Sequence, residues 1–300
     1  MNPKHIILTL LLMLCPIGMA AQSTITRHKP KPAVTKPKPA AKPKAKPKAK
    51  PAPRRNSTHH SSSTSSTVSL SAELNKLINN MVYVSSGTFT MGGTSEQGSD
   101  AYDDEKPTHN VTLSSYYICK YEVTQALWRA VMGSNPSNFK GDNLPVECVS
   151  WNDCQTFINR LNSYTGRNFR LPTEAEWEFA ARGGNYSRHY KYSGSNYIGD
   201  VAWYTNNSGN RTHPVGTKQA NELGLYDMSG NVYEWCSDWY GSYSSYPQSN
   251  PTGPYSGSYR VLRGGCWDYF ARNSRSSNRV NGSPDFRVNG LGLRLVISYL

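Results

Sequence analysis

Cysteine is the residue type in this 300-residue sequence with the widest chemistry, and five cysteines lie beyond the N-terminal segment. They are Cys119, Cys148, Cys154, Cys236 and Cys266. Cys148 and Cys154 are six residues apart with no second close pair, so the spacing does not match a zinc site. Their odd number leaves at least one thiol free or paired between chains, and the pairing stays open.

Three carboxylates, Glu174, Glu176 and Glu178, form a second group with catalytic potential. On a helix, Glu174 and Glu178 share a face, and Glu174 lies in the first turn, where the helix dipole favours an acid. Two interpretations are open: acid–base catalysis, or helix capping with ion pairs to Arg170 or Arg182. The second is favoured. No Ser-His-Asp order or glycine-rich phosphate loop accompanies these groups in the sequence.

The tail, residues 267–290, has the composition of a binding surface. Arginines alternate there with Asn, Ser, Asp, Gly and aromatic residues, the types that binding loops use for rigid contacts and adaptable hydrogen bonds. The alternative is an ordinary loop whose arginines pair within the protein. On the first interpretation, the ligand-binding residues are Trp267, Asp268, Tyr269, Phe270, Asn273, Val280, Asn281, Ser283, Asp285, Phe286, Val288 and Asn289.

Short helices and strands must position these groups. The capping residues Thr124, Ser150 and Thr173 predict three helices, which end at Gly133, Gly166 and Gly183. A further helix is expected over 72–80, and strands are expected over 81–84, 87–91 and 111–120. Beyond residue 184 the sequence shows little helical period and predicts short strands and long loops.

Several of these segments, in this order, resemble the formylglycine-generating-enzyme, or sulfatase-modifying factor, family. They are 81–92, 121–124, 145–151, 169–183 (Phe-Arg-Leu-Pro-Thr-Glu-Ala-Glu-Trp-Glu-Phe-Ala-Ala-Arg-Gly), 224–235, 260–265 and 292–294. The resemblance covers about residues 81–300. It implies one α+β domain of formylglycine-generating-enzyme-like (C-type-lectin-like) fold over 71–300, with low regular secondary structure and long loops. It is weaker as a guide to activity, because one fold hosts many functions.

Members of that family oxidise a sulfatase cysteine to formylglycine with oxygen and a copper(I) ion held by two thiolates, its preferred soft ligands. The resemblance maps the two cysteine positions onto Tyr269 and Ser274, and neither is a thiol. Cys266 is nearby and is interpreted as a small buried residue or disulfide partner, with a relocated copper ligand as the alternative. We therefore expect no copper and a non-catalytic, ligand-binding protein; a formylglycine-generating oxidoreductase that matures sulfatases is the alternative.

The resemblance also implies a calcium ion in the turn over 227–232. The ligands would be the Asp227 side chain and the carbonyl groups of Met228, Gly230 and Val232. Calcium takes such oxygen ligands on tightly curved, glycine-bearing loops. The alternative is a turn that satisfies its own hydrogen bonds.

The tail further resembles the variable region of diversity-generating-retroelement targets built on this fold. In such regions, adenine-rich codons such as those for Asn mutate to Tyr, Phe, Ser, Asp, Gly or Val. The positions that fit are Asp268, Tyr269, Phe270, Val280, Gly282, Ser283, Asp285, Phe286, Val288 and Gly290. Since the family binds substrate on this face, the expected partner is an unknown protein or surface ligand.

The first 70 residues predict export. Residues 1–21 have the basic start, short apolar run and small-residue end of a signal peptide, with an uncleaved anchor as the alternative. Residues 22–70, rich in Lys, Pro and Ala and then in Ser and Thr, predict a disordered linker. Two interpretations of this linker are open: a tether that approaches a membrane or cell envelope, or a plain spacer with no partner. The expected location is periplasmic, cell-surface or secreted.

The net charge of +13 does not indicate a nucleic-acid partner. The first 60 residues carry 13 Lys and Arg and no acidic residue, and the whole chain has 33 basic and 20 acidic residues. Subtraction leaves 20 of each sign in residues 61–300. The basic excess therefore belongs to the arm, whereas nucleic-acid binding needs a basic face on a folded domain.

Overall fold

The structure is a computed structural model that describes residues 62–298, with side chains from residue 70 onward. The expected signal segment and residues 22–61 of the expected linker lie outside the described residues. Within the described range, no helix is long and apolar enough to cross a membrane.

The strands of the described region form three small sheets. The first contains β1 (Met81–Val84), β4 (Tyr116–Cys119), β11 (Val296–Ser298) and β5 (Phe169–Arg170), in that order. The second contains β10 (Leu291–Gly292), β6 (Tyr233–Trp239), β8 (Arg260–Arg263) and β9 (Arg279–Gly282). The third contains β2 (Gly87–Met91), β3 (His109–Leu113) and β7 (Gln248–Ser249). Pairing is antiparallel except between β10 and β6 and between β3 and β7.

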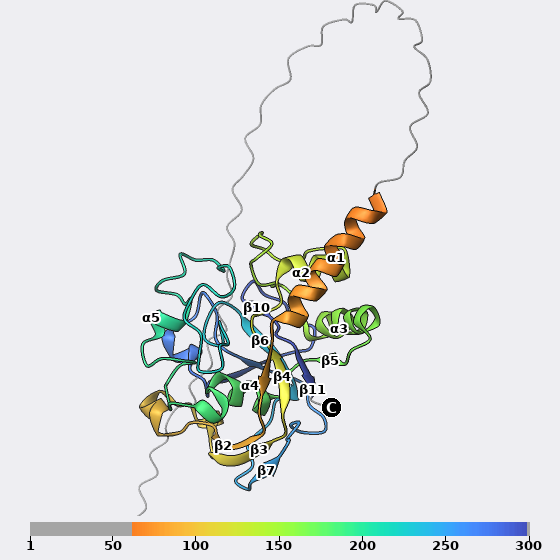
Figure 1. Ribbon diagram of the computed structural model, residues 1–300. Coiled ribbons are helices and arrows are strands. Elements are labelled where there is room, and N and C mark those ends of the chain that lie inside the picture. Colours follow the sequence, from red (N-terminus) through yellow and green to blue (C-terminus); the bar gives the residue numbers. More distant parts are fainter. Residues whose placement is uncertain (1–61, 299–300) are drawn as a thin grey trace, which may run out of the picture. The chain divides into compact units, whose positions relative to one another are not determined.

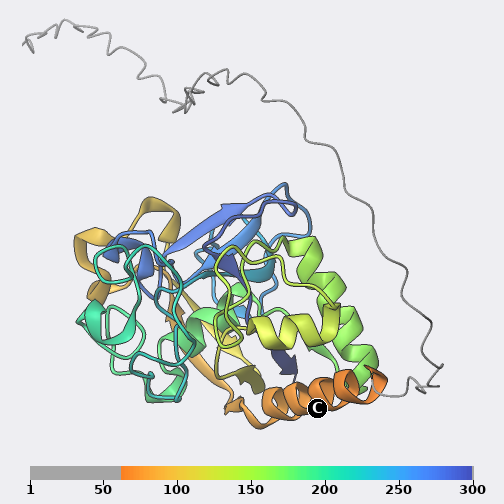
Figure 2. The ribbon, with the colours of Figure 1, turned by 90° about the horizontal axis from the view of Figure 1, so that it is seen from above.

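Five α-helices accompany these sheets in the described region. They are α1 (Ser62–Asn79), α2 (Gln125–Met132), α3 (Trp151–Thr165), α4 (Glu174–Ala181) and α5 (Ile198–Val201). Figures 1 and 2 show α1, α2 and α3 together on one side of the sheets, with α5 and its neighbouring loops on the other side. Short helices, short strands and long loops confirm the expected α+β class with low regular secondary structure.

The three capped helices begin after the predicted residues, and α2 and α3 end at the predicted glycines, whereas α4 ends one residue early, with Arg182 as its C-cap. Thr124, Ser150 and Thr173 each accept a hydrogen bond from the backbone N–H three residues on, which satisfies one of the free donors of the first turn. Gly133 and Gly166 close α2 and α3 with φ of 77° and 64°, in the left-handed region that glycine adopts without strain.

Two expectations about the N-terminal part were wrong. Helix α1 starts ten residues before the expected residue 72, inside the predicted linker; its last turns pack Leu74 and Leu77 against the core, and a helix extends readily from a packed turn. The strands expected over 81–84 and 87–91 are confirmed as β1 and β2, and they join different sheets. The single strand expected over 111–120 is two strands, because the chain leaves β3 at Ser114, whose N–H donates to the Asn250 side chain.

Candidate binding site

A pocket of about 290 Å³ lies between the tail and the second sheet. Its lining residues are Tyr233, Leu262, Cys266, Asp268, Tyr269, Val280, Asn281, Phe286, Val288, Gly290 and Leu291. Strands β6, β8, β9 and β10 supply one part of the wall, and the loops on either side of β9 supply the rest. The pocket is therefore built on a rigid sheet but opens among loop side chains.

Six of the predicted ligand-binding residues meet in this pocket: Asp268, Tyr269, Val280, Asn281, Phe286 and Val288. The others lie around it or below it. Phe270, Ser283 and Asp285 are exposed, and Asn273 and Asn289 are half-buried. Trp267 is buried, and its indole N–H donates to the Asn289 carbonyl at 2.8 Å, so it holds two parts of the tail together.

The arginines of the tail, in contrast, mostly point inward. Arg275 is fully buried and pairs with Glu105 at 2.5 Å, and Arg279 pairs with Glu174 at 2.6 Å. Arg272 lies 3.6 Å above the Tyr102 ring. Because buried guanidinium groups need partners that satisfy both charge and hydrogen bonds, these contacts fix the path of the tail.

Arg287 is the exception among these arginines, since its pair with Asp153 is partly exposed to solvent. Exposed ion pairs of this kind contribute little to stability.

The carboxylates on α4 act as caps and ion-pair partners, as the favoured interpretation predicted. Glu176 pairs with Arg170 at 2.7 Å, and Glu178 pairs with Arg182 at 2.8 Å and also with the buried Arg263. Glu174 pairs with Arg279 and Arg263, and neither of these two partners was predicted from the sequence. They lie 105 and 89 positions further along the chain, where no local pattern connects them.

Two polar groups that no sequence pattern predicted there also line the pocket, the Tyr233 hydroxyl and the Cys266 thiol. The Tyr233 hydroxyl is buried and has no hydrogen-bond partner within the described residues. The Tyr269 ring meets the Tyr233 ring edge to face at 5.4 Å, and Cys266 donates from its thiol to Asp268 Oδ1 at 3.0 Å. An unpaired buried hydroxyl costs free energy, and a ligand atom that accepts a hydrogen bond from the Tyr233 hydroxyl would recover this cost.

The groups at the positions mapped for copper do not fit a copper(I) ion. Tyr269 offers a phenol and Ser274 a buried hydroxyl, whereas copper(I) prefers soft thiolates. Burial, followed by the charge of Asp268, raises the pKa of the Cys266 thiol well above its usual value, so the thiol stays protonated. Cys119, Cys148, Cys154, Cys236 and Cys266 are all free thiols, and in the described region no group of three His, Cys, Asp or Glu side chains could hold a metal.

The Asp227 turn has features that suit calcium. Asp227 is buried at φ 57°, and its Oδ2 accepts a hydrogen bond from the Gly216 N–H at 2.7 Å. Its Oδ1 is buried without a partner in the described structure. Burial raises the pKa of this carboxyl to about 6. A cation that met Oδ1 would satisfy both the charge and the orphaned oxygen, and Met228, Gly230 and Val232 could add only their carbonyl groups.

Comparison with known proteins agrees with the family resemblance seen in the sequence. The family model described as the sulfatase-modifying factor enzyme 1-like domain matches residues 67–299. Chaperone protein LppX of Paenibacillus barcinonensis is 38% identical over 251 residues, which cover 67% of this chain and 84% of that protein. The formylglycine-generating enzyme of Streptomyces coelicolor is 37% identical over 190 residues, but these cover only 57% of this chain and 58% of the enzyme.

Among solved structures, Treponema denticola variable protein 1 is 35% identical with a TM-score of 0.67, over 73% of this chain and 95% of that one. The expected formylglycine-generating-enzyme-like, C-type-lectin-like fold is thereby confirmed.

Proposed function

Because the chain belongs to the sulfatase-modifying factor family, we propose that it uses the family fold to bind a ligand without catalysing a reaction on it. The observation that carries the proposal is the division of the tail into buried anchors and exposed contacts. Arg275 and Arg279 are at most 3% exposed, whereas Tyr269, Phe286 and Val288 are 46%, 47% and 39% exposed around one pocket. Such a surface can exchange its contact residues without losing the framework that presents them.

The chemistry of the pocket favours a protruding apolar group on a protein. Tyr269, Val280, Phe286 and Val288 provide aromatic and aliphatic walls, and Asp268 adds a carboxylate. Its volume of about 290 Å³ is at the lower limit of small-molecule pockets, which span about 300–1,000 Å³. The exposed aromatic rim around it resembles the rigid contacts of binding loops. We therefore assign the site to a side chain of a protein or cell-surface partner.

We further propose that the exposed positions of the tail are genetically variable. The two glycines among the candidate positions are constrained: a Cβ on Gly290 would lie 2.9 Å from Cys266 Sγ, and one on Gly282 would lie 3.1 Å from Trp235. Variation would thus concentrate at exposed sites such as Asp268 and Phe286. A near-copy of codons 260–295, richer in Asn codons, beside a reverse-transcriptase gene would support this, and its absence would refute it.

Oxidation of a sulfatase cysteine is the competing function, and the donor set argues against it. We expect no turnover of a cysteine-containing sulfatase peptide with added copper and oxygen, and no tight copper(I) binding in a titration with thiol counting. Turnover that Cys266→Ser abolishes would overturn the binding proposal and establish a rearranged copper site.

Calcium and location complete the proposal. We propose that a calcium ion at Asp227 fixes the turn before β6, and so supports the pocket wall at Tyr233. We also propose that the protein is exported, and that its Lys-Pro segment acts as a tether or spacer between the binding domain and the cell envelope.

Site-specific photo-crosslinking tests the binding surface directly. p-Benzoylphenylalanine is placed at Phe286 in the full chain, and in a control variant it is placed at Tyr164 on α3, which is 53% exposed. In cells that make the protein, we expect a discrete adduct from position 286 that Tyr269→Ser weakens, and no such adduct from position 164. The same adducts from both positions, or none from position 286, would contradict the proposal.

A further inference from the structure

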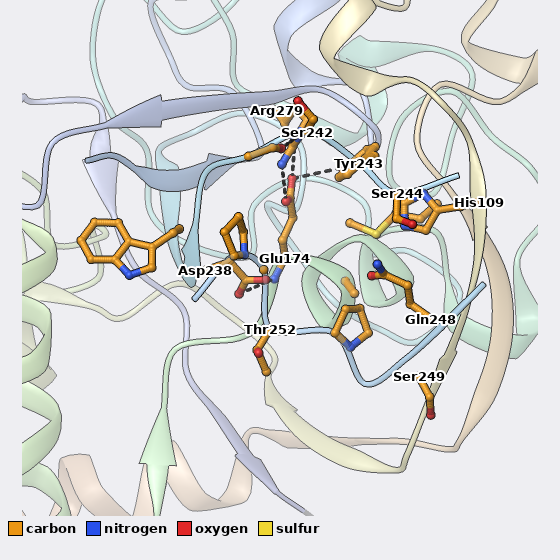
Figure 3. Close-up of a pocket in the computed structure, with 17 residues that line it drawn as sticks. His109, Glu174, Asp238, Ser242, Tyr243, Ser244, Gln248, Ser249, Thr252 and Arg279 are labelled. Carbon is orange, nitrogen blue, oxygen red and sulfur yellow. Dashed lines mark hydrogen bonds and ion pairs between the residues drawn. The ribbon is translucent and has the colours of Figure 1, made fainter. Parts of the chain in front are cut away.

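A second pocket, of about 600 Å³, opens at the N-terminus of α4 and shares no lining residue with the candidate binding site (Figure 3). Its walls come from β2, β3, β6 and β9 and from the loop that carries β7. Strand β9 separates the two pockets, because Arg279 lines this pocket and Val280 lines the other. Successive residues of a strand point to opposite faces of its sheet.

The carboxylate of Asp238 is the distinctive group of this pocket. The residue is only 4% exposed. Its Oδ2 accepts hydrogen bonds from the Glu174 N–H at 3.1 Å and the Ser237 hydroxyl at 2.9 Å. Its Oδ1 accepts none from the described residues, and it faces Gly253, which has no side chain to contact it. One carboxylate oxygen of this largely buried residue therefore lies at the pocket without a partner.

Other polar groups around the pocket also have free capacity to bond. His109 is 6% exposed, and its Nδ1 lies 3.3 Å from the Pro107 carbonyl. In the neutral ring this makes Nδ1 the donor and leaves Nε2 as an acceptor with no partner in the described structure. The Gln248 amide points toward the carboxylates in Figure 3. Ser242, Ser249 and Thr252, which also line the pocket, add hydroxyl groups.

The positive charge in the pocket is already neutralised. Arg279 donates from Nε and Nη2 to Glu174 at 2.7 and 2.6 Å, and from Nη1 to the Asp104 and Gly241 carbonyls. Glu174 also accepts from the Tyr243 hydroxyl at 3.1 Å. Because the charges of Arg279 and Glu174 cancel, the pocket has one unpaired carboxylate, that of Asp238, and no free cation among its lining residues. An anionic ligand would be repelled, and a ligand rich in donors would be favoured.

We propose that this pocket binds a small hydroxylated organic cation, whose ammonium group pairs with Asp238 Oδ1 and whose hydroxyl groups bond to Gln248 and the serine and threonine side chains. An ammonium group supplies the charge that the carboxylate lacks and donors for its free oxygen. Hydroxyl groups of the ligand both donate and accept, as the surrounding side chains require.

The protonation of Asp238 should make this binding depend on pH. Burial, followed by the charge of Glu174, raises the pKa of Asp238 to about 7, and Glu176 on α4 acts in the same direction. Two cations also act on Asp238, Arg170 from β5 and Arg260 from β8. The ion pair needs the ionised carboxylate, so affinity should rise as the pH rises through about 7 and fall as Asp238 becomes protonated.

Three probes with the same six-carbon polyol chain test the proposal in the full-length protein by calorimetry. They are glucamine, sorbitol and gluconate, which carry an ammonium, a neutral hydroxyl and a carboxylate at one end. The amine of glucamine, like that of lysine, stays protonated across the pH range used. We expect glucamine to bind at least about tenfold more tightly than sorbitol, and gluconate not to bind; a tenfold ratio corresponds to about 1.4 kcal/mol.

Matched variants locate the site. Asp238→Asn keeps an oxygen for the Glu174 N–H but removes the charge, and it should weaken glucamine binding at least about tenfold. Asp142→Asn, which removes an exposed carboxylate that does not line the pocket, should leave binding unchanged. Ser242→Trp at the exposed rim should block the pocket without touching the core.

Several results would overturn the proposal: equal binding of sorbitol and glucamine, unchanged binding by Asp238→Asn, binding that weakens from about pH 6 to 8, or no binding of any probe. The test is independent of the candidate binding site, since Phe286→Ser should leave glucamine binding intact.

Discussion

The buried ion pair between Arg275 and Glu105 is expected to hold the tail in place, and Arg275→Leu tests this. Both side chains are fully buried. Arg275 donates to both Glu105 oxygens, at 2.8 and 2.5 Å, and to the Arg272 carbonyl at 2.8 Å. The variant leaves the Glu105 carboxylate buried with only the Ser277 hydroxyl and the Tyr102 N–H as donors.

Breaking a buried pair by removing one partner costs about 3–5 kcal/mol, because the other charge remains uncompensated. For a domain of this size, each kcal/mol shifts Tm by about 2–4 °C, so Tm should fall by about 6–20 °C. Urea unfolding followed by circular dichroism would measure the free energy of unfolding, and a thermal scan would measure Tm.

Two further variants make the test specific. Arg275→Leu combined with Glu105→Leu removes both charges and should recover most of the lost stability, because a buried pair can be replaced by apolar groups at little cost. Phe286→Ser alters an exposed contact position and should change the free energy of unfolding by no more than about 0.5 kcal/mol. A loss below about 1 kcal/mol for Arg275→Leu, or no recovery in the double variant, would refute the interpretation of arginines as anchors.

The pH dependence gives an independent check on the same pair. Burial alone raises the pKa of Glu105, but the hydrogen bonds from Arg275 and Ser277 outweigh it and hold the pKa below its usual value. A carboxyl group with a lowered folded-state pKa contributes stability above its unfolded pKa, and this is lost as the pH falls through the folded pKa. The stability difference between the wild-type chain and Arg275→Leu should therefore be full near pH 7 and shrink below about pH 4.

Three more perturbations follow from the structure. Calcium at about 100 times its Kd should raise the free energy of unfolding by about 2.7 kcal/mol, and Asp227→Ala should remove this effect in a chelator-controlled thermal-shift assay. Burial raises the pKa of Asp238 from its usual value of 3.8 to about 7. The free energy of unfolding that this shift contributes is therefore full below pH 3.8 and is lost as the pH rises through 7. Asp238→Asn should consequently gain up to about 4 kcal/mol over the wild-type chain between about pH 4 and 8 in urea unfolding, and parallel curves would contradict this. Leu161→Ala, at a fully buried position of the core on α3, should cost about 2–5 kcal/mol by the same assay, whereas a smaller loss would mean that the cavity collapses.

Local features of this protein were readable from the sequence because they depend on bonds between near neighbours. Ser150 and Asp153 form the capping box of α3, and their hydrogen bonds span three residues. Thr173 and Glu176 do the same for α4. The replacement of both mapped copper ligands was also visible, since it needs only the identity of the residues and the order of the segments.

Tertiary structure alone decided which distant groups meet. Glu174 pairs with Arg279 across 105 positions, and Asp238 reaches the N-terminus of α4 across 64. The same structure separates exposed Phe286 from buried Arg279 within one tail, although both belong to the same composition. Contacts between distant positions depend on how the whole chain buries its apolar surface and satisfies its charges, and that balance leaves no local pattern in the sequence.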